Sequence, residues 1–300
     1  MKPTSNILKI ESYTVPTLTV KTRLQDLAPG MFSKSPTKSA LKKAIKNKLV
    51  KINGVAVSTG TYLIGGETID LYQNLEHNSK PSISIALDII FEDEHLALVN
   101  KPAGITVSGN KKWTLENALA SNLKRSMEKD ALFKPEPIHR LDHPTSGILL
   151  IGKTSKAVIA LNKLFENRSI QKTYYAVAIG KMHLEGILDS PIDNKPSKTD
   201  YKIMQTLVSD KYEALHLLYL TPHTGRKHQI RKHLAVQGNP ILGDLTYGIE
   251  GKKAIGNGLY LHAYSLNFTH PITNKNMSFS APLTKKFVRL FPDFLKHESK

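Results

Sequence analysis

The stretch PIHRLDHPTSGILLIGKT, residues 137–154, constrains the fold of this chain more than any other segment. Its aliphatic run, residues 148–151, is typical of a buried strand. The residues PTSG directly before that run, 144–147, predict a tight turn. One carboxylate, Asp142, stands just before the turn and two residues after Arg140. A carboxylate on a rigid turn is held in one position, as catalysis requires, but from these residues alone a structural ion pair with Arg140 is the simpler explanation.

The chain is strongly basic, because 42 lysines and arginines against 25 acidic residues give a net charge of +17 over 300 residues. That excess favours a polyanionic partner, either a nucleic acid or an anionic membrane surface. No segment approaches the ~20 apolar residues of a membrane span, and the N-terminus lacks the apolar core of a signal peptide, so we expect a cytoplasmic protein with no membrane partner. The absence of cysteine excludes a disulfide framework, a zinc ribbon and a cysteine nucleophile.

The chain divides into unequal parts, for which its length is sufficient. We expect an N-terminal tail or loosely attached strand (residues 1–16), a small domain (17–72), a polar linker (73–82), a large domain (83–296) and a C-terminal tail (297–300). In the large domain the patterns predict strands and three helices. These helices are residues 114–127 with Thr114 as N-cap, residues 156–169 with Ser155 as N-cap, and residues 225–238.

The small domain has no acidic residue between Asp26 and Glu67. Apolar residues at 41, 45 and 49 recur there with the period of one helical face. Lysines recur beside them, and an unmixed lysine face is typical of a phosphate-contacting surface, although a solvated face is the alternative. Asn53-Gly54 then predicts a β-hairpin. The lysines that we expect to dock the polyanion are Lys38, Lys42, Lys43 and Lys46.

The segment TPHTGRKHQIRKHLA, residues 221–235, places four cations at the start of a predicted helix, where the helix dipole disfavours them. Such a cost suggests a function. His223, His228 and His233 recur every five residues, which turns them about 140° apart on a helix, so they do not share a face as metal ligands would. Arg231 could reach the carboxylate of Asp142 from another segment and hold it ionised.

Alternation along the predicted strand QKTYYAVAIG, residues 171–180, places Lys172 and Tyr174 on one face. A tyrosine in a strand most often packs in the core. An enzyme that acts on a nucleic acid, however, needs a flat ring against which an extruded base can stack.

Six blocks, in order, carry a resemblance to a known family: NKPAG (100–104), HRLDHPTSGILL (139–150), QKTYYAVAIG (171–180), HTGRKHQIRKHLA (223–235), NPILGDLTYG (239–248) and LHAYSLNFTHP (261–271). Together they resemble the RluA-type pseudouridine synthases over nearly all of residues 83–285. In the small domain (17–72), the basic helical segment followed by a small hairpin, with KLVKINGVAV (48–57) and GGETIDL (65–71), resembles the S4 RNA-binding domain. The chain departs from the family pattern at His143-Pro144, at Lys227, and in lacking a histidine after the NKPAG block.

The resemblance implies an α+β fold, with a mixed, largely antiparallel central sheet flanked by helices and a small N-terminal S4-like α/β domain. It implies conversion of uridine in RNA to pseudouridine with no metal and no cofactor. Asp142 matches the family's catalytic aspartate, Tyr174 its active-site tyrosine, and Arg231 the arginine that pairs with the aspartate. Residues expected to bind the substrate are Arg140, Thr145, Lys172, Arg226, His228, Gln229 and Leu234.

Ribosomal RNA of the large subunit is the first expected substrate and tRNA the second, and we expect a monomer. Two alternatives remain at this point. One is a non-catalytic RNA-binding module that keeps the scaffold. The other is a nuclease or hydrolase that uses Asp142 with one of the histidines.

Overall fold

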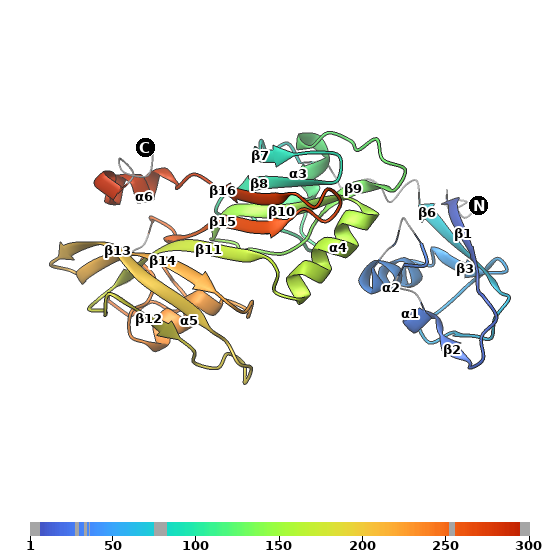
Figure 1. Ribbon diagram of the computed structural model, residues 1–300, viewed down its shortest axis with the longest axis horizontal. Coiled ribbons are helices and arrows are strands. Elements are labelled where there is room, and N and C mark those ends of the chain that lie inside the picture. The colour runs from blue at the N-terminus through green and yellow to red at the C-terminus, as the bar shows by residue number, and fades with distance from the viewer. Residues whose placement is uncertain are drawn as a thin grey trace.

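The computed structural model describes residues 7–27, 30–32, 35, 37–74, 83–251 and 256–294. It contains a small N-terminal sheet and a large sheet in separate parts of the molecule (Figure 1). Most of the predicted linker, and the C-terminal tail predicted at 297–300, lie outside the described residues. No helix in the described ranges is long and apolar enough to cross a membrane.

The N-terminal sheet has the strand order β1-β6-β3-β4. Strand β1 (Ile7–Thr14) pairs antiparallel with β6 (Thr68–Asn74) along its whole length. Of the two alternatives for residues 1–16, the tail is wrong for residues 7–14, which form a strand whose backbone groups are satisfied in the sheet. The predicted linker also began too early, since residues 73 and 74 belong to β6.

Helix α2 (Lys38–Lys46) packs on this sheet. Thr37 caps it by accepting from the backbone N–H of Ala40, and Leu41 and Ile45 are buried in the small core. The predicted hairpin joins β3 (Val50–Ile52) to β4 (Val55–Ala56), with positive φ angles of 50° at Asn53 and 84° at Gly54. That pair of angles is typical of a type I′ turn. The remaining short elements are β2 (Thr22–Arg23), α1 (Leu24–Leu27) and β5 (Tyr62–Leu63).

The large sheet runs in the order β12-β13-β14-β11-β15-β10-β8-β7, with β16 on β15 and β9 on β10. Of these pairings only β10 with β15 is parallel, so the predicted α+β class with a mixed, largely antiparallel sheet is confirmed. The strands are β7 (Asp88–Glu92), β8 (Leu96–Lys101), β9 (Ala131–Pro137), β10 (Ser146–Thr154), β11 (Gln171–Ile179), β12 (Glu185–Leu188), β13 (Thr199–Ser209), β14 (Glu213–Pro222), β15 (Leu261–Thr269) and β16 (Asn276–Ser280).

Strand β10 is the predicted core strand, and all nine of its residues are buried. Its parallel pairing with β15 requires glycine at position 147. Gly147 has a φ of +116°, and a Cβ there would lie 2.1 Å from the backbone oxygen of Ala263 on β15. Next to it, Ser146 Oγ lies 2.9 Å from Nδ1 of the buried His262. The TSG sequence thus permits a close approach of the two strands directly after the turn that carries Asp142.

Among the described residues, four helices accompany the large sheet. Helix α3 (Leu115–Asn122) has the predicted cap, Thr114, but ends five residues earlier than predicted. Helix α4 (Ser155–Glu166) is capped by Thr154, so the predicted cap at Ser155 is one residue late. Helix α5 (Gln229–Val236) begins four residues after the predicted start, and α6 (Lys285–Leu290) lies near the C-terminus. Two of the four cations assigned to the start of α5 therefore lie in the preceding turn.

Candidate active site

Asp142 lies in a four-residue turn between β9 and β10. The backbone N–H of Thr145 donates to the carbonyl of Asp142 at 3.0 Å, so the turn spans 142–145, two residues before the predicted position. The carbonyl of the next residue, His143, accepts from the N–H of Gly104 at 2.9 Å and from Lys101 Nζ at 3.4 Å. These bonds tie the loop after β8 to the turn and so fix the backbone beside Asp142.

The carboxylate of Asp142 faces two side chains from the region of α5. Arg231 Nη1 lies 3.3 Å from one oxygen, and His228 Nε2 lies 3.6 Å from the other. The Asp142 side chain keeps 19% of its surface exposed, so a substrate can reach it. Arg140 is exposed, and among the described residues no ion pair joins it to Asp142. The local ion pair considered from the sequence is therefore not formed, and the predicted contact with Arg231 is.

Arg231 is oriented by a second carboxylate, Asp244, which the sequence indicated only as part of the NPILGDLTYG block and without a role. Its Nε and Nη2 donate to the two oxygens of Asp244 at 2.7 and 2.8 Å. Asp244 also accepts from the backbone N–H groups of Thr246 and Tyr247. Burial opposes the charge of Arg231, but hydrogen bonds and attraction from Asp244 and Asp142 outweigh it and raise the pKa of the guanidinium. Asp244 thus holds the Nε–Nη2 edge of the guanidinium and leaves Nη1 for Asp142.

His228 precedes α5 in a left-handed conformation, with a φ of 57°. Its Nδ1 lies 2.9 Å from the hydroxyl of Tyr247, and the two rings meet edge to face. Burial lowers the pKa of His228, against the attraction of Asp142, so the imidazole is neutral at neutral pH. A left-handed non-glycine residue costs roughly 1–2 kcal/mol, and such strain is concentrated at functional sites.

These side chains surround a cavity of about 560 Å³, which lies within the usual range for small-molecule sites. Strand β11 contributes Lys172 and Tyr174 from one face, as predicted. Burial, and then the charge of Asp142, raises the pKa of Tyr174, so its phenol stays protonated. The predicted residues that line the cavity are Arg140, Asp142, Thr145, Lys172, Tyr174, Arg226, His228, Gln229 and Arg231.

Two residues predicted to bind substrate are placed differently. Leu234 is fully buried in the core and does not line the cavity. Leu234 stands four residues after Ile230, so the two share the helical face that packs in the core. Gln229 lines the cavity, but its amide bonds Thr224 and Arg226 on one side and Lys198 and Thr199 on the other. Its polar atoms therefore support the turn before α5 and have no capacity left for a substrate.

Lys101 is a site residue that the sequence indicated only as part of the NKPAG block. It is wholly buried, and Nζ donates to the carbonyls of Pro102 and Ile105 at 2.9 Å each, in addition to that of His143. Burial lowers its pKa to about 8, against the raising effect of Asp142. The NKPAG block was the only available signal, because the hydrophobic pattern of a strand does not show which of its lysines point inward.

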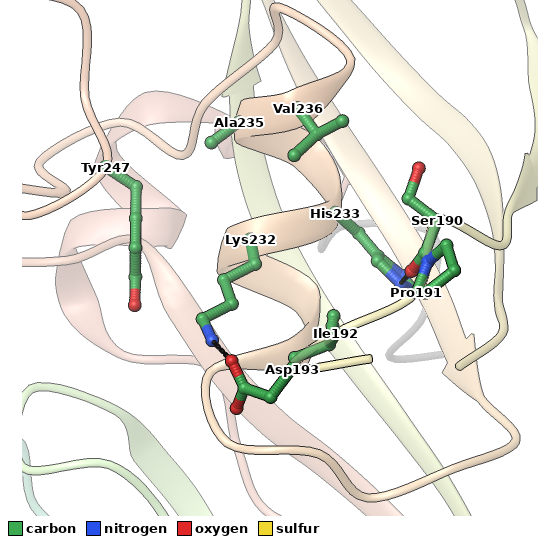
Figure 2. A pocket seen from close by; sticks show the side chains of 9 residues that line it. All are labelled: Ser190, Pro191, Ile192, Asp193, Lys232, His233, Ala235, Val236 and Tyr247. Atoms are coloured by element: carbon green, nitrogen blue, oxygen red, sulfur yellow. Dashed lines mark hydrogen bonds and ion pairs between the residues drawn. The ribbon is translucent and has the colours of Figure 1, made fainter. Parts of the chain in front are cut away.

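The opposite side of α5 is anchored to the loop before β13 (Figure 2). Lys232 forms an ion pair with Asp193 at 2.8 Å. His233 is buried, and its ring nitrogens contact the hydroxyls of Ser197 and Thr199. A mainly apolar cavity of about 450 Å³ lies beside these groups and contains none of the predicted catalytic residues. The helix is thus fixed on one side and presents Arg231 on the other.

The three histidines spaced by five residues contact different groups. His223 Nε2 lies 2.6 Å from Asp200, whereas His228 faces Asp142 and His233 faces two hydroxyls. In the part of the chain that the structure describes, no group of three or more His, Asp or Glu side chains is arranged to hold a metal ion.

The four lysines of α2 are exposed, as a docking face requires. Lys38, however, pairs with Asp26 at 2.9 Å. This acid lies outside the acid-free stretch and approaches the helix only in the folded domain. One of the four positive charges is therefore already balanced.

The cleft therefore holds a buried, oriented arginine, Arg231, beside a partly exposed carboxylate, Asp142. This arrangement is typical of an enzyme site in which the carboxylate is held in one position. The family model for RNA pseudouridylate synthase matches residues 95–236. Ribosomal large subunit pseudouridine synthase D of Nitrosomonas europaea is 32% identical, over 82% of this chain and 77% of the relative. The protein of the same name from Haemophilus influenzae is 32% identical, over 87% of this chain and 89% of the relative.

A solved structure, human RNA pseudouridylate synthase domain containing 4, is similar in fold with a TM-score of 0.57 at 22% identity, over 69% of this chain and 93% of that one. The chain belongs to the RNA pseudouridine synthase family, as its motifs predicted. It is accordingly an RNA pseudouridine synthase, which makes it an isomerase.

Proposed function

We propose that this protein converts particular uridines to pseudouridine in large-subunit ribosomal RNA, with Asp142 as the catalytic carboxylate and without a cofactor. The RNA class is supported by the names of the two relatives, both of which are large-subunit enzymes. The role of Asp142 rests on one observation, its position in the cleft against Arg231 and His228.

The reaction breaks the bond between C1′ and N1 of uridine and forms one between C1′ and C5. The proton on C5 leaves, and N1 gains a proton, so no atom is gained or lost overall. Asp142 could start the reaction by attacking C1′, by adding to C6, or by removing the proton from C2′. In each version it must be ionised. The uracil stays in the cleft throughout, so the reaction needs neither an activated water nor a metal.

The arrangement around Arg231 suits an ionised but reactive Asp142. A guanidinium paired only with Asp142 would neutralise the charge of that carboxylate and bind both of its oxygens. Here Asp244 takes two of the hydrogen bonds at 2.7 and 2.8 Å, and Asp142 receives one longer bond at 3.3 Å. Since two carboxylates share one arginine, the group carries a net negative charge, and Asp142 is stabilised without being saturated.

Tyr174 and the cations around the cleft would bind the flipped nucleotide. The phenol stays protonated at neutral pH, so Tyr174 would act through its ring and as a hydrogen-bond donor, not as a base. Lys172 lies on the same wall, and Arg140 and Lys227 stand exposed at the rim of the cavity. Cations in these positions would contact the flanking phosphates.

We further propose that the N-terminal domain acts as an S4-like RNA-docking module. Lys42, Lys43 and Lys46 would contact phosphates, while Lys38 serves to hold α2 to Asp26. Residues of a single chain suffice to line the cleft, so we propose that the protein acts as a monomer. We also propose the cytoplasm as its location.

The experiment is pseudouridine mapping of total RNA from cells with the gene, without it, and with Asp142→Asn or Asp193→Asn in its place. We expect specific sites in large-subunit RNA to be lost without the gene, restored by Asp193→Asn, and not restored by Asp142→Asn. Asp193→Asn is a matched control, since it removes an exposed carboxylate away from the cleft. Loss of sites in tRNA alone would contradict the ribosomal assignment, and full restoration by Asp142→Asn would contradict the catalytic one.

Dialysis of the purified protein against a strong chelator tests the absence of a cofactor. Turnover of an unmodified transcript should be unchanged at fixed RNA folding. Activity that is lost and then restored by zinc or magnesium, or a cleaved RNA strand as product, would favour the hydrolase alternative.

A further inference from the structure

The loop that follows the NKPAG block displays the only tryptophan of the chain. Trp113 is 59% exposed, and all six residues from 108 to 113 are exposed. Lys111 and Lys112 stand directly before it. Within the described ranges, neither lysine forms an ion pair, and no other aromatic ring packs on the indole. A large aromatic side chain left in water beside two cations usually marks a contact surface.

The backbone of this loop is held in place even though its side chains are exposed. Asn117 Nδ2 donates to the carbonyls of Lys111 and Lys112 at 3.3 and 2.7 Å. Thr114, the N-cap of α3, is buried and pairs with Thr106 at the start of the loop. Anchoring at both ends lowers the entropic cost of presenting the indole to a ligand.

The loop lies between the catalytic turn and helix α2. At its start, Gly104 bonds the carbonyl of His143, the residue after Asp142. In its middle, Gly109 and Asn110 line a groove of about 790 Å³ to which α2 contributes Lys43. A strand of RNA that contacts both α2 and the catalytic cleft would therefore pass this loop.

We propose that Trp113, with Lys111 and Lys112, forms a stacking site for an unpaired base of the RNA outside the segment that enters the cleft. The proposal rests on the proposed function, because the RNA must thread from α2 to Asp142. The indole would stack on one base, and the two lysines would contact its neighbouring phosphates. Stacking on tryptophan accepts any base, so this site supplies affinity and register without reading sequence.

The chemistry of the surface favours RNA over a second copy of the chain. Two copies, each with a net charge of +17, would bring lysine pairs together. Lysine is depleted at the centres of protein–protein interfaces, whereas lysine beside an aromatic ring is typical of single-strand binding.

Because Trp113 is the sole tryptophan, its fluorescence reports on this site alone. The probe is an unmodified transcript of large-subunit ribosomal RNA. We expect the transcript to quench Trp113 emission in the wild type and equally in Asp142→Asn, since Asp142 is not part of the stacking site. Trp113→Ala should weaken binding roughly five- to 150-fold, which corresponds to one stacked base, and Trp113→Phe should keep most of the affinity. Replacing both lysines by glutamine should flatten the salt dependence by about 0.7 in log–log slope for each phosphate that is no longer neutralised.

A matched control moves the fluorophore. Val208, on the β13–β14 hairpin, is 90% exposed, so Trp113→Phe combined with Val208→Trp gives a single exposed tryptophan elsewhere on the large sheet. Its emission should not respond to the transcript. An equal response at both positions, or no quenching of Trp113 by RNA that the enzyme binds and converts, would overturn the proposal and leave the function standing. So would a Trp113→Ala variant that changes the oligomeric state in sedimentation but not RNA binding. Quenching of the wild-type protein without any pseudouridine formed would instead contradict the proposed function.

Discussion

Replacing Asp244 by asparagine tests whether this residue, and not Asp142, holds Arg231 in place. The Asp244 side chain is fully buried, and Arg231 is 5% exposed. The change keeps the shape but removes the charge and leaves one acceptor oxygen facing two guanidinium donors. Breaking a buried ion pair costs about 3–5 kcal/mol, and the remaining contact with Asp142 offsets part of that. We expect a loss of about 3 kcal/mol in unfolding free energy of the catalytic domain, measured by urea denaturation followed by near-UV circular dichroism.

The same variant should lose activity while still folded, because Arg231 would turn toward Asp142 and misplace it. A displacement of about 1 Å at a reacting group can lower the rate about 100-fold. We therefore expect the kcat of Asp244→Asn to be about 100-fold lower than that of the wild type. Asp193→Asn is the control for stability. It also removes the acid of an ion pair, but this acid is 66% exposed, and asparagine tolerates the φ of 52° found there. If the two variants shifted the urea midpoint equally, or if Asp244→Asn kept the wild-type rate, the proposed role of Asp244 would be refuted.

Three further substitutions, or sets of them, test other features of the fold and the docking face. Gly147→Ala should destabilise the domain by roughly 3 kcal/mol or more, because its Cβ would meet the backbone of Ala263. In Gly66→Ala, where the Cβ meets open space, the urea midpoint should shift less. Burial lowers the pKa of His262 to about 4. The unfolded chain alone therefore takes up this proton between about pH 6.5 and 4, so stability should fall by up to about 3 kcal/mol as the pH drops through that window. His262→Gln should reduce this slope in urea midpoints measured against pH, and the remaining slope comes from other buried histidines such as His139. Neutralising three lysines of α2 should flatten the salt dependence of RNA binding by about 0.7–0.9 in log–log slope for each phosphate that is no longer neutralised. Lys38→Gln should change the slope less, because Asp26 balances the charge of Lys38. Slopes identical to the wild type in the three-lysine variant would refute the docking role of α2. The three lysines are Lys42, Lys43 and Lys46.

Local patterns predicted the elements whose causes are local. The aliphatic run of β10, the alternation in β11 and the Asn53-Gly54 turn each depend on residues that are neighbours in the chain. The ordered motifs likewise identified the family and the candidate aspartate. Errors occurred at the ends of elements, such as the cap of α4 and the start of α5, because the end of a helix depends on backbone angles that the residue types permit but do not impose.

Contacts between distant segments were decided only by the tertiary structure. The sequence alone established a basic chain with one carboxylate on a turn before a core strand, because charge and hydrophobic periodicity are properties of the residues themselves. It could not show that β1 completes the small sheet, that Asp26 balances Lys38, or that Asp244 orients Arg231. Each of these pairs residues that are brought together by the packing of separate elements. The partner of a polar group is chosen by that packing, since a buried donor or acceptor must be satisfied by whatever the fold places within hydrogen-bonding distance.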